Sequence, residues 1–310
     1  MNQPRILVIR HSALGDIVQS FAPFAAIRAH HRDARVTLLT TATYAAWLGR
    51  APWFDAVEVD TRPGLLDPAG LARLRQRLIG HDRVYDLQTS TRSTRYRWLA
   101  GHAEWSGIGR FASHPHRNPE RDHIHTYERQ REQLRDAGIG VVPALAPEAL
   151  APLTAPPGFA LPPGPYAVLV PGAAPHRPEK RWPDAHFVAL AASLAARGLA
   201  VVIVGTTAEA PLGTAIRQAT PRVMDLTGRT SLPELAHVLG QAALVVGNDT
   251  GPMHLATAFA RKAVVLFGGA SNPSLTAPRY PDGGWPIIAS APHLADLPPE
   301  RVAAALDLTP

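Results

Sequence analysis

Short apolar runs alternate with amphipathic segments along most of the chain, a pattern typical of strands followed by helices. The apolar run at 5–10 (RILVIR) predicts a central strand, and the segment 16–30 predicts a helix whose apolar residues, spaced by three and four, face a sheet. A strand at 36–40 completes a βαβ unit. The alternation continues with helices at 45–48, 65–79 and 127–137 and strands at 57–59 and 83–87. The first half is therefore expected to be an open, doubly wound α/β sheet.

A proline-rich segment with hardly any charge, 142–165, interrupts this pattern. Proline at such density stops helices and central strands, so the segment is expected to connect two domains, 1–155 and 156–310. Beyond it the alternation restarts, with strands at 166–170, 200–204, 224–226, 244–246 and 263–267 and helices at 184–196, 209–218, 232–239 and 253–261. The second half is thus predicted to be another Rossmann-like domain. A last helix is expected at 298–306, and the sequence allows it to pack back on the first domain.

The most compact of these units spans 244–269, where a strand, the turn 248–252, a helix and a second strand follow one another. A turn that brings a helix N-terminus to the carboxyl edge of a parallel sheet offers free backbone N–H groups and the positive end of the helix dipole to a ligand. Such a site suits phosphate. The local sequence is equally compatible with Asp249 or Thr250 capping the helix and Gly251 easing the turn.

Composition excludes several classes of protein. With 46% hydrophobic and 18% charged residues, the chain can bury a core and is not expected to be disordered. It has no cysteine, which rules out disulfides and thiolate metal sites and fits a reducing compartment. The N-terminus lacks the pattern of a signal peptide, and no apolar run approaches membrane-spanning length. We therefore expect a cytoplasmic protein.

The net charge is +6 and comes from arginine, because lysines are few. Many of these arginines crowd the segment 92–131. A basic surface can serve nucleic acid, anionic lipid or an acidic substrate, so the charge alone does not choose among them. Nucleic acid is the weakest candidate, since the segment has no recognisable RNA- or DNA-binding motif. The histidines between His114 and His125 have no metal-ligand spacing and no cysteine partner, so a polar loop near an acceptor is expected there.

Four motifs occur in order along the chain, namely SALGDIVQSFAP, PGAAPHRPEKRWP, VIVGTTAE and VVGNDTGPMHLATAF. Together they resemble glycosyltransferase family 9, the ADP-heptose:lipopolysaccharide heptosyltransferase family. The resemblance implies a GT-B fold, in which two Rossmann-like domains face a central cleft. It also implies an inverting transfer of a sugar from a nucleotide donor, heptose from ADP-heptose in the family, without a metal or a cofactor. The second domain would bind most of the donor.

The resemblance assigns roles to individual residues. Asp16 matches the general base of the family's GD motif, which takes the proton of the acceptor hydroxyl; from the local sequence alone, capping of the first helix is the more common role. Lys180 matches the lysine that stabilises the leaving diphosphate. Glu209 matches a carboxylate near the nucleoside, where a ribose diol would need an acceptor. A first-turn helix glutamate is nearly as good an interpretation of Glu209.

Further matches lie in the last motif. Asp249, Thr250 and Gly251 match the family's DTG, whose turn would hold phosphate while the aspartate would either hydrogen-bond to sugar hydroxyls or order the loop. His254 follows, either as a donor ligand or as an interior histidine. The loop 172–179 departs from the family because it lacks the hydroxyl residues that often touch phosphate, although His176 and Arg177 can substitute. The identity of the donor therefore stays open.

The arginine-rich first domain is expected to bind the acceptor, an anionic glycan or lipid-linked molecule at the cytoplasmic face of the inner membrane. The candidate acceptor ligands are Arg92, Arg95, Arg110 and Arg121. Two other functions fit the same design, a sugar-nucleotide epimerase and a nucleotide-sugar binder without turnover. The presence of Asp16 argues against a binder without turnover.

Overall fold

The chain divides into two compact units, Met1–Leu145 and Ala146–Pro310, in a computed structural model that describes residues 3–306. The division falls inside the proline-rich segment, earlier than the expected boundary after residue 155. Part of that segment forms a 3-10 helix, η3 (Pro147–Leu153). Two residues later, the Ala155 N–H donates to the carbonyl of Pro233 at 3.0 Å, which ties the connection to the second unit.

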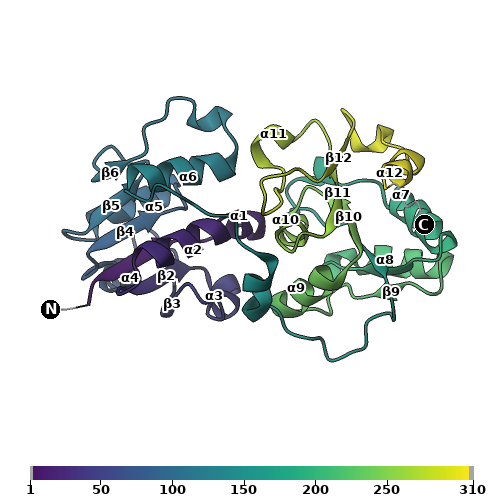
Figure 1. Ribbon diagram of the computed structural model, residues 1–310, viewed down its shortest axis with the longest axis horizontal. Helices are drawn as coiled ribbons and strands as arrows, with labels where there is room; N and C mark the ends of the chain where they lie inside the picture. Colours follow the sequence, from purple (N-terminus) through teal and green to yellow (C-terminus); the bar gives the residue numbers. More distant parts are fainter. Residues whose placement is uncertain (1–2, 307–310) are drawn as a thin grey trace. The chain divides into compact units, whose positions relative to one another are not determined.

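The first unit is built on a parallel six-stranded sheet (Figure 1). Its strands are β1 (Arg5–Ile9), β2 (Arg35–Thr40), β3 (Ala56–Val59), β4 (Arg83–Asp86), β5 (Glu104–Gly107) and β6 (His114–Pro115). They lie side by side in the order β3-β2-β1-β4-β5-β6. The sequence pattern predicted the first four. It missed β5 and β6, which are short and carry too few apolar residues to produce a strand signal.

The helices of the first unit differ in detail from the prediction. The single helix expected over 16–30 is two helices, α1 (Leu14–Gln19) and α2 (Phe21–His30), which meet at Ser20. α4 (Pro68–Leu78) begins later than expected, because the Asp67 side chain caps it by accepting the Gly70 N–H at 2.8 Å. The others are α3 (Ala42–Leu48), α5 (Thr91–Arg95), α6 (Thr126–Asp136) and the 3-10 helices η1 (Tyr96–Trp98) and η2 (Arg121–His123).

The second unit repeats this design with its own parallel sheet, in the order β12-β11-β10-β7-β8-β9. The strands are β7 (Tyr166–Val170), β8 (Ala200–Ile203), β9 (Met224–Asp225), β10 (Leu244–Asn248), β11 (Lys262–Phe267) and β12 (Ile287–Ser290). The helices are α7 (Asp184–Ala196), α8 (Ala210–Ala219), α9 (Leu232–Gln241), α10 (Gly251–Ala258), α11 (Pro273–Thr276) and α12 (Pro299–Ala305), with the 3-10 helices η4 (Pro178–Lys180), η5 (Thr207–Glu209) and η6 (Leu294–Asp296). Strand β12 was not predicted.

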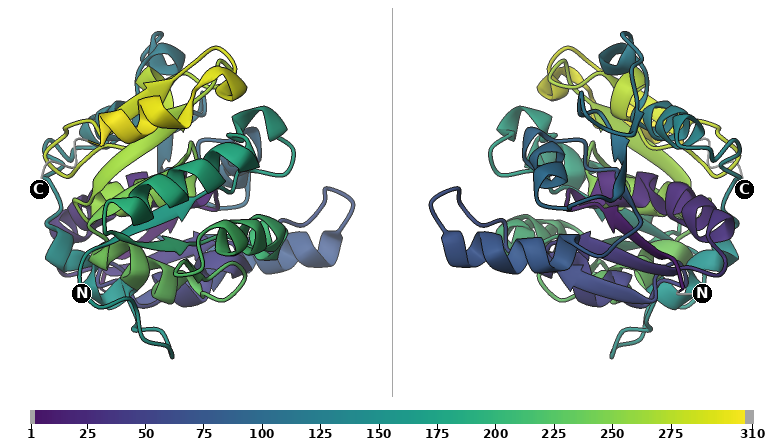
Figure 2. Two further views of the ribbon diagram at one scale, coloured as in Figure 1. Left: turned by 90° about the vertical axis from the view of Figure 1, so that its right-hand side faces the viewer. Right: turned by 90° about the vertical axis from the view of Figure 1, so that its left-hand side faces the viewer.

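The last helix, α12, belongs to the second unit. Its residues Val302 and Ala303 join the same buried core as Phe187 and Leu194 of α7, and the two helices lie next to each other (Figure 2). The buried face of α12 therefore packs within its own unit. No helix among residues 3–306 is both long and apolar enough to cross a membrane.

Each sheet has one pair of neighbouring strands at which the strand order reverses, β1 and β4 in the first unit and β7 and β10 in the second. Doubly wound sheets bind ligands beyond the carboxyl ends of such a pair. At these ends Ile9 pairs with Asp86, and Val170 pairs with Gly247. Gly247 must lack a side chain, because a Cβ there would lie 2.5 Å from the Val170 backbone oxygen. Functional residues are therefore expected just after these four strands.

Candidate active site

Asp16 lies in the first turn of α1, just after the loop that leaves β1. Its two carboxylate oxygens have different partners, since Oδ1 lies 3.2 Å from Nη2 of Arg10 and Oδ2 accepts the backbone N–H of Ala13 at 3.0 Å. Ala13, and not Asp16, holds the N-cap position of α1. The Asp16 side chain is 43% exposed. The carboxylate is thus fixed in orientation and still accessible to a substrate.

Arg10 holds Asp16 in place, although it belongs to none of the four motifs. Its side chain is 5% exposed, and its guanidinium also donates to the carbonyl of Leu87, just after β4. Burial lowers the pKa of this guanidinium, and the carboxylates of Asp16 and Asp86 oppose that shift. Arg10 therefore gives Asp16 a fixed, oppositely charged partner. Its position directly after an apolar strand is the signal that would have identified it.

A buried polar network surrounds this pair at the carboxyl edge of the sheet. His11 Nε2 lies 3.0 Å from Asp60 Oδ2, which also accepts the Tyr96 hydroxyl at 2.6 Å. Burial acts to raise the pKa of Asp60, but hydrogen bonds from His11 and Tyr96 outweigh it and hold the pKa below its ordinary value. Asp86, at the end of β4, is fully buried, and this burial raises its pKa to about 6. Gln88, in the loop after β4, accepts the N–H of His11 at 2.8 Å and so links this loop to the loop after β1.

The four arginines expected to bind the acceptor are not equivalent. Arg121 is half-buried and donates from Nη2 to the hydroxyl of Thr89 at 3.0 Å, next to the end of β4. Its other terminal nitrogen, Nη1, is buried and has no hydrogen-bond partner within the described part of the chain. Arg92 is exposed and donates to the carbonyl of Pro63 at 3.1 Å. The other two, Arg95 and Arg110, are exposed.

In the second unit, Lys180 and Asp249 meet across the strand pair β7 and β10. The Lys180 ammonium lies 2.6 Å from Asp249 Oδ2, and the two side chains are 20% and 7% exposed. Lys180 ends η4 in the loop after β7, whereas Asp249 follows β10 directly. The charge-assisted contact brings a cation to the N-terminus of α10. A diphosphate placed there would meet this cation and free helix amides together.

Asn248 connects the loop after β7 to strand β10 and was not recognised as important from the sequence. It is fully buried. Its Nδ2 donates to the Pro171 carbonyl at 2.6 Å, and its Oδ1 accepts the Trp182 N–H at 3.1 Å. The Trp182 indole is itself buried and donates to the carbonyl of Leu297 at 2.8 Å. One amide side chain therefore fixes both ends of the loop that carries Lys180.

The turn after Asp249 opens α10. Thr250 holds the N-cap position in extended geometry, but its side chain makes no capping hydrogen bond. Gly251 is the first helical residue, and Pro252 lies in the first turn, where a missing N–H costs nothing. His254 is 6% exposed and lies on the inner side of the helix. This burial matches the interior histidine that the sequence left open, and its contact with a donor stays a prediction.

Glu209 lies where the loops after β7 and β8 approach each other. Its Oε2 accepts both the N–H and the hydroxyl of Thr206, at 2.8 and 2.7 Å, in a capping box at η5. A Cβ placed on Gly172 would lie 3.6 Å from Oε1 of Glu209, so the carboxylate borders the loop after β7. The structure thus gives Glu209 the capping role that the sequence left open. Its contact with a ribose stays a prediction.

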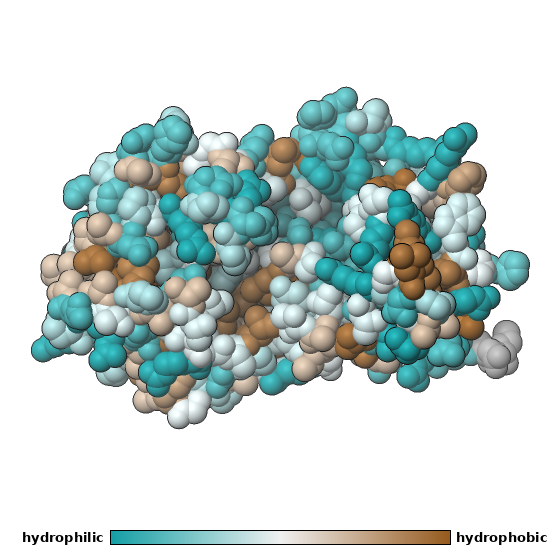
Figure 3. All heavy atoms as spheres, turned by 180° about the vertical axis from the view of Figure 1, so that it is seen from behind, coloured by the Kyte–Doolittle hydropathy of each residue, from teal (hydrophilic) through white to brown (hydrophobic). Residues whose placement is uncertain are grey.

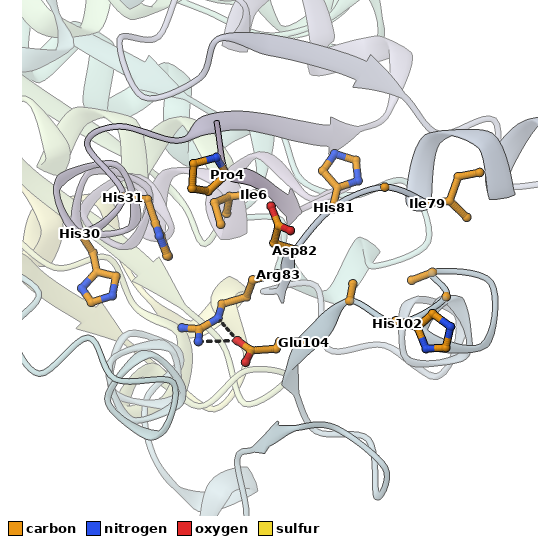
Figure 4. A pocket seen from close by; sticks show the side chains of 14 residues that line it. Pro4, Ile6, His30, His31, Ile79, His81, Asp82, Arg83, His102 and Glu104 are labelled. Carbon is orange, nitrogen blue, oxygen red and sulfur yellow. Dashed lines mark hydrogen bonds and ion pairs between the residues drawn. The ribbon is translucent and has the colours of Figure 1, made fainter. Parts of the chain in front are cut away.

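Two histidines of the segment 114–125 have structural partners. His116 is buried, with Nδ1 3.0 Å from Asp136 Oδ2, and His125 caps α6 by accepting the Tyr127 N–H at 3.0 Å. A hollow of about 700 Å³ at the opposite edge of the sheet is lined by His30, His31, His81 and His102 (Figure 4). Burial lowers the pKa of His31 to about 4. Among residues 3–306, no group of three or more His, Asp or Glu side chains is arranged to hold a metal ion.

Similarities to known proteins agree with this arrangement. A sequence model of glycosyltransferase family 9 (heptosyltransferase) matches residues 71–283. A stretch of 106 residues is 39% identical to lipooligosaccharide heptosyltransferase 2 of Haemophilus influenzae, a match that covers 33% of this chain and only 30% of that relative.

Solved structures match over nearly the full chain. The E. coli ADP-heptose LPS heptosyltransferase II aligns over 98% of this chain and 97% of its own, with a TM-score of 0.76 and 24% identity. The E. coli heptosyltransferase WaaC with ADP aligns over 97% and 98%, with a TM-score of 0.78 and 22% identity. These likenesses show that the two doubly wound units together form a GT-B fold. Because the family model matches more than half of the residues of this chain, the chain belongs to glycosyltransferase family 9.

Proposed function

We propose that this protein is an inverting, metal-independent glycosyltransferase that moves heptose from ADP-heptose to an anionic acceptor, either a lipopolysaccharide-core-like glycan or another lipid-linked molecule. The reaction would take place at the cytoplasmic face of the inner membrane. The main support is the accessible carboxylate of Asp16, which Arg10 holds in place beyond the strand pair β1 and β4. Heptose and the acceptor class are inferred from the relatives, whose names describe lipooligosaccharide and lipopolysaccharide heptosyltransferases.

The proposed reaction is a direct displacement at the anomeric carbon. The acceptor hydroxyl oxygen attacks that carbon as the bond to the donor's β-phosphate oxygen breaks, so that ADP leaves from the opposite face and the configuration inverts. The hydroxyl proton passes to the carboxylate of Asp16. A general base must be held in a fixed orientation toward the acceptor hydroxyl, and the contacts with Arg10 and Ala13 hold the carboxylate of Asp16 in this way.

The donor is proposed to bind in the second unit. Lys180, the turn at Thr250 and Gly251 and the N-terminus of α10 would take the diphosphate, since cations and free backbone N–H groups stabilise the charge that develops on it. Asp249 would hydrogen-bond to sugar hydroxyls, with His254 beside it on α10. Glu209 would contact the ribose. In the first unit, Arg92, Arg95, Arg110 and Arg121 would bind anionic groups of the acceptor and its surroundings.

A panel of nucleotide sugars tests the donor assignment. ADP-heptose and ADP should raise the midpoint of thermal unfolding of the full chain, whereas UDP- and GDP-sugars should not, because binding to the folded state alone stabilises it. In the presence of a lipopolysaccharide-core acceptor, ADP release should match glycan formation one for one. Release of a free or isomerised sugar without an acceptor would instead identify an epimerase.

Chelation tests the account of the leaving group. Because Lys180 and backbone amides are proposed to neutralise the diphosphate, transfer should continue at an unchanged rate in EDTA. Dialysis against EDTA followed by an assay with and without added Mg²⁺ measures this directly. A strict requirement for Mg²⁺ or Mn²⁺ would contradict the proposed role of Lys180.

A further inference from the structure

Two aromatic side chains stand exposed side by side on the first unit. Trp98, in η1, is 69% exposed, and Phe111, in the loop after β5, is 64% exposed. Their ring centroids are 5.4 Å apart. Hydrophobic residues reach the surface elsewhere too, as the neighbours Leu65 and Leu66 do, and Figure 3 shows several such patches on one face of the molecule. Trp98 and Phe111 differ in being two large aromatic rings that contact each other at the surface, and such a pair needs an explanation other than chance.

The surroundings of this pair are basic. Arg110 lies with its guanidinium carbon 6.0 Å from the Phe111 ring centroid, and Arg95 precedes Trp98 by three residues on one helical stretch, which places both on the same side. Between residues 87 and 119 the chain has five arginines and a single acidic residue, Glu104. Glu104 is engaged by Arg83 and His114. We call the group Arg95, Trp98, Arg110 and Phe111 the aromatic–arginine surface.

The size and charge of this surface argue against a second copy of the chain as its partner. Large aromatic side chains bury about 150–250 Å² each, so two that are two-thirds exposed offer roughly 200–330 Å². A stable dimer needs about 800 Å² from each partner. A symmetric contact would also bring like-charged arginines face to face. An extended anionic surface complements the positive charge of these arginines better than a second copy of the chain does.

We propose that the aromatic–arginine surface docks on an anionic lipid bilayer. Trp98 and Phe111 would enter the headgroup region, where aromatic side chains are enriched in membrane proteins. The guanidinium groups of Arg95 and Arg110 would bind lipid phosphates. The inference deepens the proposed function, because a lipid-linked acceptor lies in such a bilayer. It assigns Arg95 and Arg110 to the headgroups around the acceptor and leaves Arg92 and Arg121 to the acceptor glycan.

Vesicle sedimentation tests the proposal. The full chain should bind vesicles of phosphatidylcholine with phosphatidylglycerol and not vesicles of phosphatidylcholine alone, and 0.5 M salt should release it because exposed charges are screened. The double variant Trp98→Ser/Phe111→Ser should bind at least tenfold more weakly. The variant Val141→Ser, which removes an apolar side chain that is 73% exposed on the same unit, is the matched control and should bind like the wild type.

Tryptophan fluorescence gives a second readout that does not depend on affinity. Binding to the anionic vesicles should shift the emission of the wild type to the blue, and the variant Trp98→Phe should lose most of that shift while still sedimenting with the vesicles. Circular dichroism and thermal unfolding establish that each variant is folded.

The outcomes separate this proposal from the proposed function. Equal binding of wild type and the double variant, or equal binding to both kinds of vesicle, overturns the docking surface even if heptose transfer is observed. Binding to an RNA oligonucleotide but not to vesicles at the same salt concentration also overturns it. If the double variant alone loses vesicle binding, the surface stands, whether or not the protein transfers heptose.

Discussion

The contact between Lys180 and Asp249 leads to a prediction with two measurable parts. Replacing Lys180 by Met removes the cation proposed to bind the donor diphosphate. A hydrogen bond to a charged group contributes about 1.5–3 kcal/mol, so the Kd for ADP should rise roughly 10- to 150-fold. Water screens this site little, because the two side chains are 20% and 7% exposed. The same change leaves the Asp249 carboxylate without its charged partner, which should lower the free energy of unfolding by about 1–3 kcal/mol.

The variant Asp249→Asn should not weaken the affinity for ADP as Lys180→Met does. An amide oxygen still accepts an N–H from Lys180, but it no longer competes with phosphate for the positive charge. ADP should therefore bind at least as tightly as in the wild type, while heptose transfer falls because the proposed sugar contact is weakened. The gain in ADP affinity should vanish in the double variant with Lys180→Met, which a double-mutant cycle detects.

Isothermal titration with ADP and urea unfolding measure the two effects. Lys262→Met is the matched control, because Lys262 is the other lysine of the chain and lies at the start of β11, at the amino end of its strand. It should leave ADP binding unchanged. If Lys180→Met binds ADP as tightly as the control, Lys180 does not hold the diphosphate, and the donor site described above is wrong.

Three further predictions concern the first unit. Asp16→Asn should lower the transfer rate at least a hundredfold with ADP affinity retained, as expected for a lost base, whereas the control Asp184→Asn, at a first-turn position of α7, should not. A near-normal rate would leave Asp16 only its structural contacts with Arg10 and Ala13. Arg121→Gln should raise the KM for a water-soluble acceptor fragment and leave the KM for the donor unchanged, whereas the control Arg73→Gln, on the exposed side of α4, should change neither. If Arg121→Gln and the wild type have the same KM for the acceptor, Arg121 is not part of the acceptor site. Because burial raises the pKa of Asp86 from 3.8 to about 6, the folded state binds an extra proton between these values, so the free energy of unfolding should fall by up to about 3 kcal/mol as pH rises from about 4 to 6. Urea unfolding of the wild type and Asp86→Asn across this range measures that slope, which the variant should lack.

The sequence was sufficient for much of the fold. Strands β1, β7 and β10 were predicted because each is a continuous apolar run, which parallel strands buried on both faces produce. Strands β5, β6 and β12, of two to four residues each, contain no such continuous run, and their position depends on neighbours that are distant in the sequence. The division of the helix expected over 16–30 into two helices at Ser20 was not predicted, because the apolar spacing continues across the break.

The candidate site was predictable where its residues belong to short motifs. Asp16 and Lys180 were found because family motifs contain them. Arg10 and Asp60 were missed, since each gains its role from a partner brought close by the fold. Asp60, for example, meets Tyr96, which is 36 residues away in the sequence. Such pairs cannot be recognised from local patterns, although a polar residue directly after a buried strand is a useful sign.

The two hydrogen bonds of Asn248 have a consequence for how much the loop after β7 can vary. Because they anchor Pro171 and Trp182, the residues between these points form a closed segment whose ends do not depend on its composition. Substitutions inside that segment can accumulate without displacing the lysine near its end. This explains how the chain can carry the unusual stretch GAAPHRPE and keep Lys180 beside Asp249. Residues 172–179 can therefore change in composition as long as Asn248 keeps its two hydrogen bonds.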